Sequence, residues 1–448
     1  MTMNLSAKLV SKLGSTNSKI PLAVKDLCNS AGCTYFSYDA GGAIEGKDRL
    51  IDEVGTGALW LFGIPAYKKL IDMTLFKKAG LDPAVDVRVV KNSAYFKKAV
   101  ENAPTDTIKK SLTDAGKNLG KTKSLNIAKF GIAMGLTMLS YFGLTKFKQE
   151  ITKKNIEKEY IAKQMNKTVL THNYELFEKS NVFSEIEQPK KQKNPSFGSA
   201  AVIKAAEEIM LNPVKNMMLL DMGISAERLS GARTKGEFAE YAIKEGSFLF
   251  FVYGADKMIK KGIDFAAEKL FKTPIGLDAK LISSDYAKDI LKNSKLKTQV
   301  KEFTQKFSSN TDINALYDFI FKNQTHPVVE AAKQSGIIST IKTKSGDVLI
   351  DTRKYIDPKD IQKLTKELNK FIDFKEPSKQ TVSKYLNKIK GLKVASTVLN
   401  IGLCCLALGY IVPKAMFKYR EKHQNGKNDF HVKTEYEKEL AKKNLCTL

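Results

Sequence analysis

Arginine and histidine are scarce in this 448-residue sequence. It carries four histidines, and only six of its 74 lysine and arginine residues are arginines. The other 68 basic residues are lysines, and the net charge is +26. Arginine, with its planar fork, is the usual reader of phosphates, whereas lysine supplies only a point charge. The charge therefore indicates a positive field that favours anionic partners, either acidic lipid or a nucleic-acid backbone. The alternative is that the lysines simply solvate helix faces.

Motifs of catalysis and cofactor binding are also missing. The sequence contains no HExxH and no GxxxxGK[ST], and Gly55-Thr-Gly57 lacks the third glycine of a dinucleotide fingerprint. The five cysteines form no CxxC pair, which excludes a zinc framework and suits a reducing compartment: Cys28, Cys33, Cys404, Cys405 and Cys446. We therefore predict a protein that is not an enzyme and has no cofactor, no metal and no small-molecule substrate.

One segment holds the closest pair of arginines, Arg228 and Arg233, near Asp221. It could form a paired-charge site at the mouth of the following apolar helix. We favour a capped turn with ion pairs at the surface, because such pairs are common and individually weak.

Long uncharged runs are present. Val394–Pro413 is a 20-residue run between lysines, and a helix of that length spans about 30 Å, the thickness of a bilayer's hydrocarbon core. Phe130–Thr145 is a weaker copy between Lys129 and Lys146. Val54–Tyr67 and Gly246–Ala255 are too short to span alone, and they suit helices in the membrane interface or, alternatively, buried core helices. At least one transmembrane helix is expected.

Small and polar residues in these runs suggest where helices pack. Small residues four and eight apart let two helices approach closely, and an asparagine within a span is tolerable when it faces another helix. The packing residues that we predict on this basis are Gly131, Gly135, Gly143, Asn400 and Gly402. Lysine pairs that follow the two short runs should reach lipid headgroups: Lys68 and Lys69, and Lys260 and Lys261.

Comparison of the chain with itself suggests a tandem duplication. Lys68-Lys69-Leu-Ile-Asp72 recurs as Lys260-Lys261-Gly-Ile-Asp264 at an offset of 192 residues, and residues 123–144 match residues 390–411 at an offset of 267. The order of the two features is the same in both halves. The alternative is that two apolar helices merely share composition.

The sequence therefore predicts a mainly α-helical protein of two related halves. The first half is 1–165, with apolar helices near 54–76 and 125–147, and a polar linker follows at 166–199. The second half is 200–425, with apolar helices near 245–268 and 392–413 and an inserted region at 290–380, and a polar tail covers 426–448. In the insertion, residues 336–352 alternate around Lys344-Ser-Gly-Asp347, which predicts a β-hairpin. Asp357 and Pro358 should open a helix that runs to about Phe371, and Ala200–Leu211 and Ile313–Phe321 also have helical periodicity.

We expect a non-enzymatic scaffold or interaction protein of the cytoplasmic membrane. We expect no cleaved signal peptide, because the N-terminus lacks the apolar core of one. Its expected partners are an anionic lipid bilayer and further copies of itself in a homo-oligomer. One alternative is a transporter or channel subunit built from two repeats, although the apolar segments are few and contain no acidic residue. Another is a soluble, basic helical nucleic-acid-binding protein, against which the low arginine content counts. No specific nucleic acid is predicted.

Overall fold

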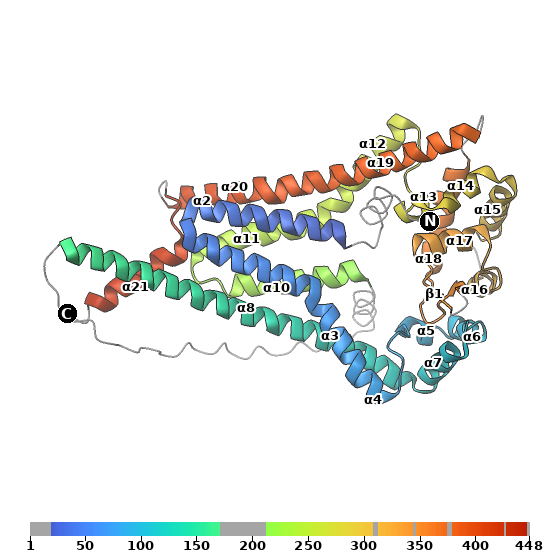
Figure 1. Ribbon diagram of the computed structural model, residues 1–448, viewed down its shortest axis with the longest axis horizontal. Helices are drawn as coiled ribbons and strands as arrows, with labels where there is room; N and C mark the ends of the chain where they lie inside the picture. The colour runs from blue at the N-terminus through green and yellow to red at the C-terminus, as the bar shows by residue number, and fades with distance from the viewer. Residues whose placement is uncertain are drawn as a thin grey trace. The chain divides into compact units, whose positions relative to one another are not determined.

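The computed structural model describes residues 19–170, 212–307, 312–343, 346–373, 379–424 and 427–445. Across these residues the protein is mainly helical, and one two-stranded antiparallel sheet lies late in the chain (Figure 1). Three of the predicted features fall outside the described residues, wholly or in part: the linker beyond Leu170, the helix at Ala200–Leu211, and the tip of the hairpin at Lys344 and Ser345.

The elements of the first part of the chain are α2 (Ile20–Ala58), η1 (Leu59–Gly63), α3 (Ile64–Ile71), η2 (Asp72–Phe76), α4 (Lys77–Ala79), α5 (Val87–Lys91), α6 (Ser93–Glu101), α7 (Asp106–Lys117) and α8 (Leu119–Leu170). Those of the second part are α10 (Pro213–Ser230), α11 (Lys235–Leu249), η3 (Phe250–Ala255), α12 (Asp256–Phe271), α13 (Ala279–Ser283), α14 (Asp285–Lys292), α15 (Ser294–Lys306), α16 (Ile313–Lys322), α17 (Pro327–Ser335), β1 (Thr340–Lys342), β2 (Val348–Ile350), α18 (Pro358–Ile372), α19 (Lys379–Leu406), η4 (Ala407–Ile411), α20 (Val412–His423) and α21 (His431–Leu445). The four η segments are π-helical turns within longer helical stretches.

The chain folds into two compact units, and each unit draws on both of the predicted halves. Unit 1 contains residues 1–29, 59–137 and 248–410, and unit 2 contains residues 30–58, 138–247 and 411–448. The predicted helical ranges 54–76, 125–147, 245–268 and 392–413 are helical throughout.

Unit 1 has a hydrophobic core. Buried aliphatic and aromatic side chains from α5 to α7 and from α13 to α19 form one continuous cluster, with Tyr95, Tyr317 and Phe371 among its largest members. The rings of Tyr95 and Tyr317 meet edge to face, with their centroids 4.8 Å apart. Most of this cluster comes from the region predicted as an insertion and the rest from the neighbouring helices, so that region shares one core with them. In the same unit, α12 and α19 lie side by side (Figure 1).

Elements with strong local signals form where the sequence predicts them. β1 and β2 pair antiparallel with Ile341 opposite Leu349, which confirms the hairpin. Helix α18 begins at Pro358, and the side chain of Asp357 caps it by accepting a hydrogen bond from the Lys359 amide. Helix α16 covers the helical pattern predicted from Ile313.

Helix α2 is interrupted at Gly42, where the backbone has φ 76° and ψ −170°. An L-residue with a side chain adopts this positive φ only at a steric cost, whereas glycine adopts it readily. The break divides α2 into two shorter helices, and the second one carries the charged residues described below.

Two helical stretches are long and apolar enough to cross a membrane: Leu119–Met165, within α8, and Val382–His423, which runs from α19 through α20. Only 17% of the most apolar window of the first stretch, and 39% of that of the second, is buried inside the protein. Large apolar side chains are therefore exposed along both stretches, including Leu139 at 65% and Leu406 at 54%.

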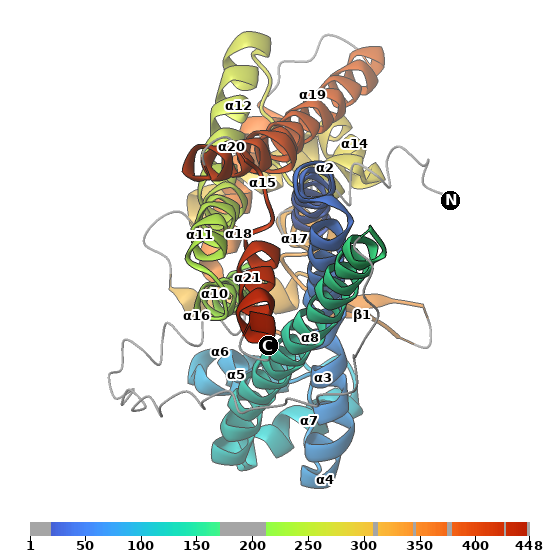
Figure 2. The same ribbon diagram turned by 90° about the vertical axis from the view of Figure 1, so that its left-hand side faces the viewer.

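Unit 2 combines the second part of α2, most of α8, and the helices α10, α11, α20 and α21. Figure 2 shows α21 lying between α8 and α11. Lys433 of α21 reaches Glu159 of α8 at 2.6 Å, and Tyr436 donates a hydrogen bond to Glu157 at 2.5 Å. Among the described residues of this unit, buried polar and charged side chains together outnumber buried apolar ones.

Candidate functional site

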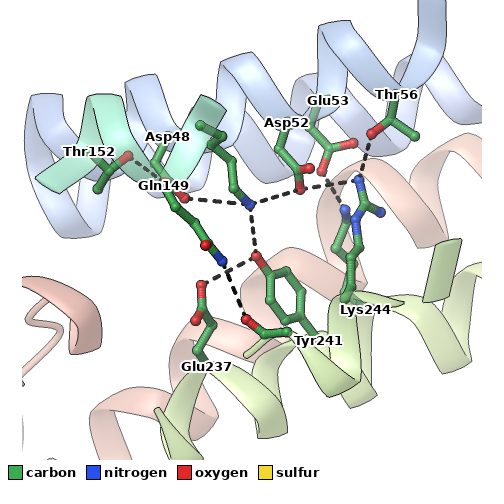
Figure 3. Close-up of polar contacts among 12 residues, drawn as sticks. Asp48, Asp52, Glu53, Thr56, Gln149, Thr152, Glu237, Tyr241 and Lys244 are labelled. Carbon is green, nitrogen blue, oxygen red and sulfur yellow. Dashed lines mark hydrogen bonds and ion pairs between the residues drawn. The ribbon is translucent and has the colours of Figure 1, made fainter. Parts of the chain in front are cut away.

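The most distinctive feature of the structure is a network of buried charged side chains in unit 2, which we call the charge network. Its carboxylates are Glu45, Asp48, Asp52, Glu53, Glu227, Glu237, Glu240 and Glu245, and its cations are Arg49, Lys148, Arg228, Arg233, Lys244 and Arg420. Figure 3 shows Asp48, Asp52 and Glu53 along α2, facing Tyr241 and Lys244 of α11. Within α2, and likewise within α11, spacings of three and four residues place the charged side chains on one face of the helix.

Arg228, at the end of α10, is held by partners from three other helical segments. Its guanidinium pairs with Glu245 at 2.5 Å and with Asp52 at 3.1 Å, and its Nε donates to the hydroxyl of Tyr141 at 2.8 Å. Next to it, the ammonium of Lys244 pairs with Glu53 and lies 3.3 Å from Glu245. Arg228 and Lys244 therefore each contact carboxylates, as burial of charge requires, whereas the guanidinium of Arg49 lies 5.4 Å from the ring centroid of Tyr241.

Arg233 and Lys148 bind the next turn of α2. Arg233 contacts Asp48 at 3.1 Å and Glu237 at 2.6 Å. Lys148 of α8 lies 3.7 Å from Asp52 and donates to the hydroxyl of Tyr241 at 3.2 Å. These contacts link α2, α8 and α11 through polar atoms instead of apolar packing.

Arg420 of α20 closes the network at its other end. Its guanidinium donates to both oxygens of Glu45, at 2.7 Å each, and to both oxygens of Glu240, at 2.6 and 2.7 Å. The Arg420 side chain is fully buried. A planar guanidinium clamped between two carboxylates is a strong, directional contact. His431 of α21 adds a further contact, 3.3 Å from Glu240.

Among the described buried residues of this unit, carboxylates outnumber cations. Nine buried acids, the eight of the charge network and Asp221, face five buried cations and the partly exposed Arg233. Burial raises the pKa of Glu227, and it raises that of Glu45 despite the hydrogen bonds from Arg420. Burial also opposes ionisation of Glu240, but hydrogen bonds from His431 and Arg420 outweigh it and lower the pKa to about 2. The network thus holds both firmly ionised carboxylates and carboxylates that retain protons more readily.

A smaller polar cluster lies in unit 1. The fully buried ammonium of Lys25 pairs with Asp256, and the Asn400 amide donates to the same carboxylate at 2.6 Å. The Asn400 carbonyl oxygen has no hydrogen-bond partner among the described residues. Asn400 of α19 therefore faces α12.

The four glycines that we predicted to pack against another helix lie on the surface of the structure. Gly131, Gly135, Gly143 and Gly402 are exposed, and a Cβ added at any of them would meet nothing within 4 Å among the described residues. Their role in helix packing stays a prediction and would require a partner from outside this chain. Of the predicted headgroup lysines, Lys68 and Lys260 are half-buried, whereas Lys69 and Lys261 are exposed.

One interpretation of the sequence is wrong. Arg228 and Arg233 do not form exposed ion pairs, because both bind carboxylates that are at least 94% buried, including Asp52 and Asp48. His431, which the sequence places in a polar tail, contacts the buried Glu240. A usable signal was present at residues 45, 48, 49, 52 and 53, where charged residues recur on one helix face.

The arrangement suits binding and holding helices more than bond chemistry. Among its described residues, the site brings together carboxylates, guanidinium groups, ammonium groups and hydroxyl groups that are mostly paired with one another. Comparison with known proteins adds no assignment, because no family model, no curated protein and no solved structure matches this chain.

Proposed function

We propose that this protein is a non-enzymatic, membrane-embedded helical scaffold built from two related halves, in which the charge network fastens the helices of unit 2 to one another. The exposed glycines of α8 and α19 would let a further helix approach closely, which supports self-association as its mode of assembly.

The observation that carries the proposal is the distribution of polarity in unit 2. In a water-soluble helix the apolar face is buried and the charged face is solvated. In α2 the reverse holds, because Asp52 and Glu53 are buried while Leu50 and Val54 are 43% and 64% exposed. Leu139 of α8 and Phe238 of α11 are 65% and 50% exposed in the same unit. Lipid accommodates such a surface, whereas water does not.

Helix contacts in unit 1 support the related halves. Asp72 pairs with Lys129 in the first half, and Asp264 accepts a hydrogen bond from Ser396 in the second. The offsets of the sequence comparison, 192 and 267 residues, convert one pair into the other. The π-helical segment η1 (Leu59–Gly63), moved by 192 residues, falls within η3 (Phe250–Ala255). The helix that follows the break at Gly42 likewise corresponds to α11.

The charge network also supports the proposal of two related halves. The offset of 192 residues places an acid on an acid at three positions: Glu45 and Glu237, Asp48 and Glu240, and Glu53 and Glu245. Arg420 binds Glu45 and Glu240, while Arg233 binds Glu237 and Asp48. Exchange of the paired acids converts one arginine's partners into the other's. Such an exchange is what duplicated helices facing each other would produce.

The proposal predicts that one lysine on the exposed face of α8 prevents stable insertion. Leu139→Lys would place a charge in hydrocarbon, at a cost of about 3 kcal/mol near the middle of a span. In water the same change would cost almost nothing, since the position is 65% exposed. We expect the parent protein to stay in the membrane pellet during alkaline carbonate extraction, and the Leu139→Lys variant to move substantially into the supernatant.

Ile313→Lys is the matched control. Ile313 is 50% exposed on α16, outside both stretches that could cross a membrane, so this variant should behave like the parent. Full release of the parent protein by carbonate, or equal behaviour of the two lysine variants, would contradict the proposal.

A proton-coupled transporter is the second candidate, and the surplus of buried carboxylates favours it. Glu227 is 6% exposed and has a raised pKa, so it is suited to take up and release a proton. The sequence argument against a transporter was that the apolar segments contain no acid; the acids of unit 2 lie beside them instead.

Reconstituted vesicles with an internal pH-sensitive dye test this second candidate. A transporter would dissipate an imposed pH gradient, and Glu227→Gln would slow the dissipation at least tenfold. Glu302→Gln, which changes an exposed glutamate of α15, should leave the rate unchanged. A gradient that decays no faster than in protein-free vesicles would exclude proton transport and leave the scaffold.

A further inference from the structure

A cluster of lysines lies in unit 1 where α3 meets the start of the apolar run of α8. The Lys68 ammonium lies 5.8 Å from the ring centroid of Phe130, and that of Lys129 lies 5.3 Å from the ring centroid of Phe76. Aromatic faces attract cations and hold them at a defined place. Both lysines are therefore positioned by rings instead of moving freely in solvent.

Positive charge dominates at this place. Lys129 pairs with Asp72 at 2.5 Å, and Lys19 is a further cation close to Lys68. Burial, followed by the nearby charges of Lys129 and Lys19, lowers the pKa of Lys68, while Asp72 acts in the opposite direction. Helix α2 begins at Ile20 and has no acid in its first turn, so the positive end of its dipole is not neutralised by its own side chains. An anion would relieve this excess charge.

Exposed apolar side chains lie close in sequence to the lysines of the cluster. Ile20 is 39% exposed, Leu70 is 53% exposed and Met73 is 63% exposed, and all three are close in sequence to Lys19, Lys68 or Asp72. Lys129 itself immediately precedes the uncharged run that starts at Phe130. Cations next to an exposed apolar surface match a molecule with an anionic head and an apolar tail.

We propose that Lys19, Lys68 and Lys129 form a binding site for the phosphate of an anionic phospholipid, whose acyl chains lie along the exposed apolar side chains of α3 and α8. The inference rests on the proposed membrane location and adds a specific lipid contact to it. The bound lipid would fix the depth of α3 and α8 at the membrane surface.

The second half offers a matched comparison. Lys260 corresponds to Lys68 at the offset of 192 residues, but it pairs with Asp264 at 3.2 Å. The neighbouring Lys393 donates to the Ile275 carbonyl at 2.7 Å. In this second cluster Lys260 and Lys393 are both engaged by groups of the protein itself, so it should not select an anionic lipid.

The test is lipid binding by the full-length protein in a neutral detergent, followed by native mass spectrometry. Dioctanoyl phosphatidylglycerol is the anionic probe, and dioctanoyl phosphatidylcholine is the neutral one. We expect the anionic probe to bind more tightly, Lys68→Gln to weaken its binding about fivefold, and Lys68→Arg to retain it, since one lysine near an anionic headgroup contributes about that factor. Lys260→Gln should have no effect.

Three results would overturn the inference: equal binding of the two lipids, equal effects of Lys68→Gln and Lys260→Gln, or full competition by millimolar inorganic phosphate, which would indicate a site for a free anion. These results are independent of carbonate extraction. A protein that stays in the membrane but binds both lipids equally would remove the lipid site and leave the membrane location intact.

Discussion

Replacement of Arg420 by methionine is expected to lower the free energy of unfolding by about 3–5 kcal/mol. The guanidinium makes hydrogen bonds to four carboxylate oxygens, two on Glu45 and two on Glu240, and its side chain is fully buried. Without it, two buried carboxylates face each other, while the His431 ring stays 3.3 Å from Glu240. Unfolding of the detergent-solubilised protein, followed by far-ultraviolet circular dichroism, measures the loss.

A variant that restores the charge balance distinguishes a loss of stability caused by unpaired charge from one caused by lost packing. The triple variant R420M/E45Q/E240Q removes the cation and both anions, so we expect it to recover most of the stability. Lys163→Met is the control, because it breaks an exposed pair with Glu159 (3.1 Å) and should change stability by less than about 0.5 kcal/mol. If R420M unfolds like the parent, or if the triple variant is no better than R420M, the charge network is not what holds these helices together.

The features that the sequence predicted correctly are those determined by a few adjacent residues. The hairpin follows from alternation around a turn, and α18 from an aspartate followed by a proline. Such signals act over one helical turn or one tight turn. They do not depend on what surrounds the element, so they can be identified without knowing the fold.

The charge network depends on the surroundings, and for that reason the sequence did not reveal it. Charges at residues 45, 48, 49, 52 and 53 form a stripe along one helix face, which in water is the solvated face. The same stripe is buried here, because the opposite face carries Leu50 and Val54 and both are exposed. Periodicity identifies the two faces of such a helix. Which face is buried depends on whether the solvent is water or lipid.

The offset between the two proposed halves contained more information than the sequence comparison drew from it. Positions 237, 240, 241, 244 and 245 lie 192 residues after the five stripe positions, and four of these five are charged in the second half as well. Alignment of polar positions within helices would therefore have paired the two stripes. The apolar matches that were used instead are weaker evidence, because leucine, glycine and alanine recur in any apolar helix.

The second large effect is expected at the Lys25 pair of unit 1. Asp256→Leu would leave a fully buried ammonium without its counter-ion, at a cost of about 3–5 kcal/mol. Lys25→Met should cost less, because Asp256 keeps the hydrogen bond from the Asn400 amide at 2.6 Å. A double-mutant cycle with the variant K25M/D256L measures the coupling between the two residues.

We expect the double variant to be more stable than Asp256→Leu alone, because it removes the buried ammonium together with its counter-ion and leaves two apolar side chains of similar volume. Lys260→Met, which breaks a half-exposed pair with Asp264, is the control and should have a small effect. If the two single losses simply add, Lys25 and Asp256 do not depend on each other. The contact between the start of α2 and α12 would then be held by apolar packing, and the polar pair would have to be explained by function instead of stability.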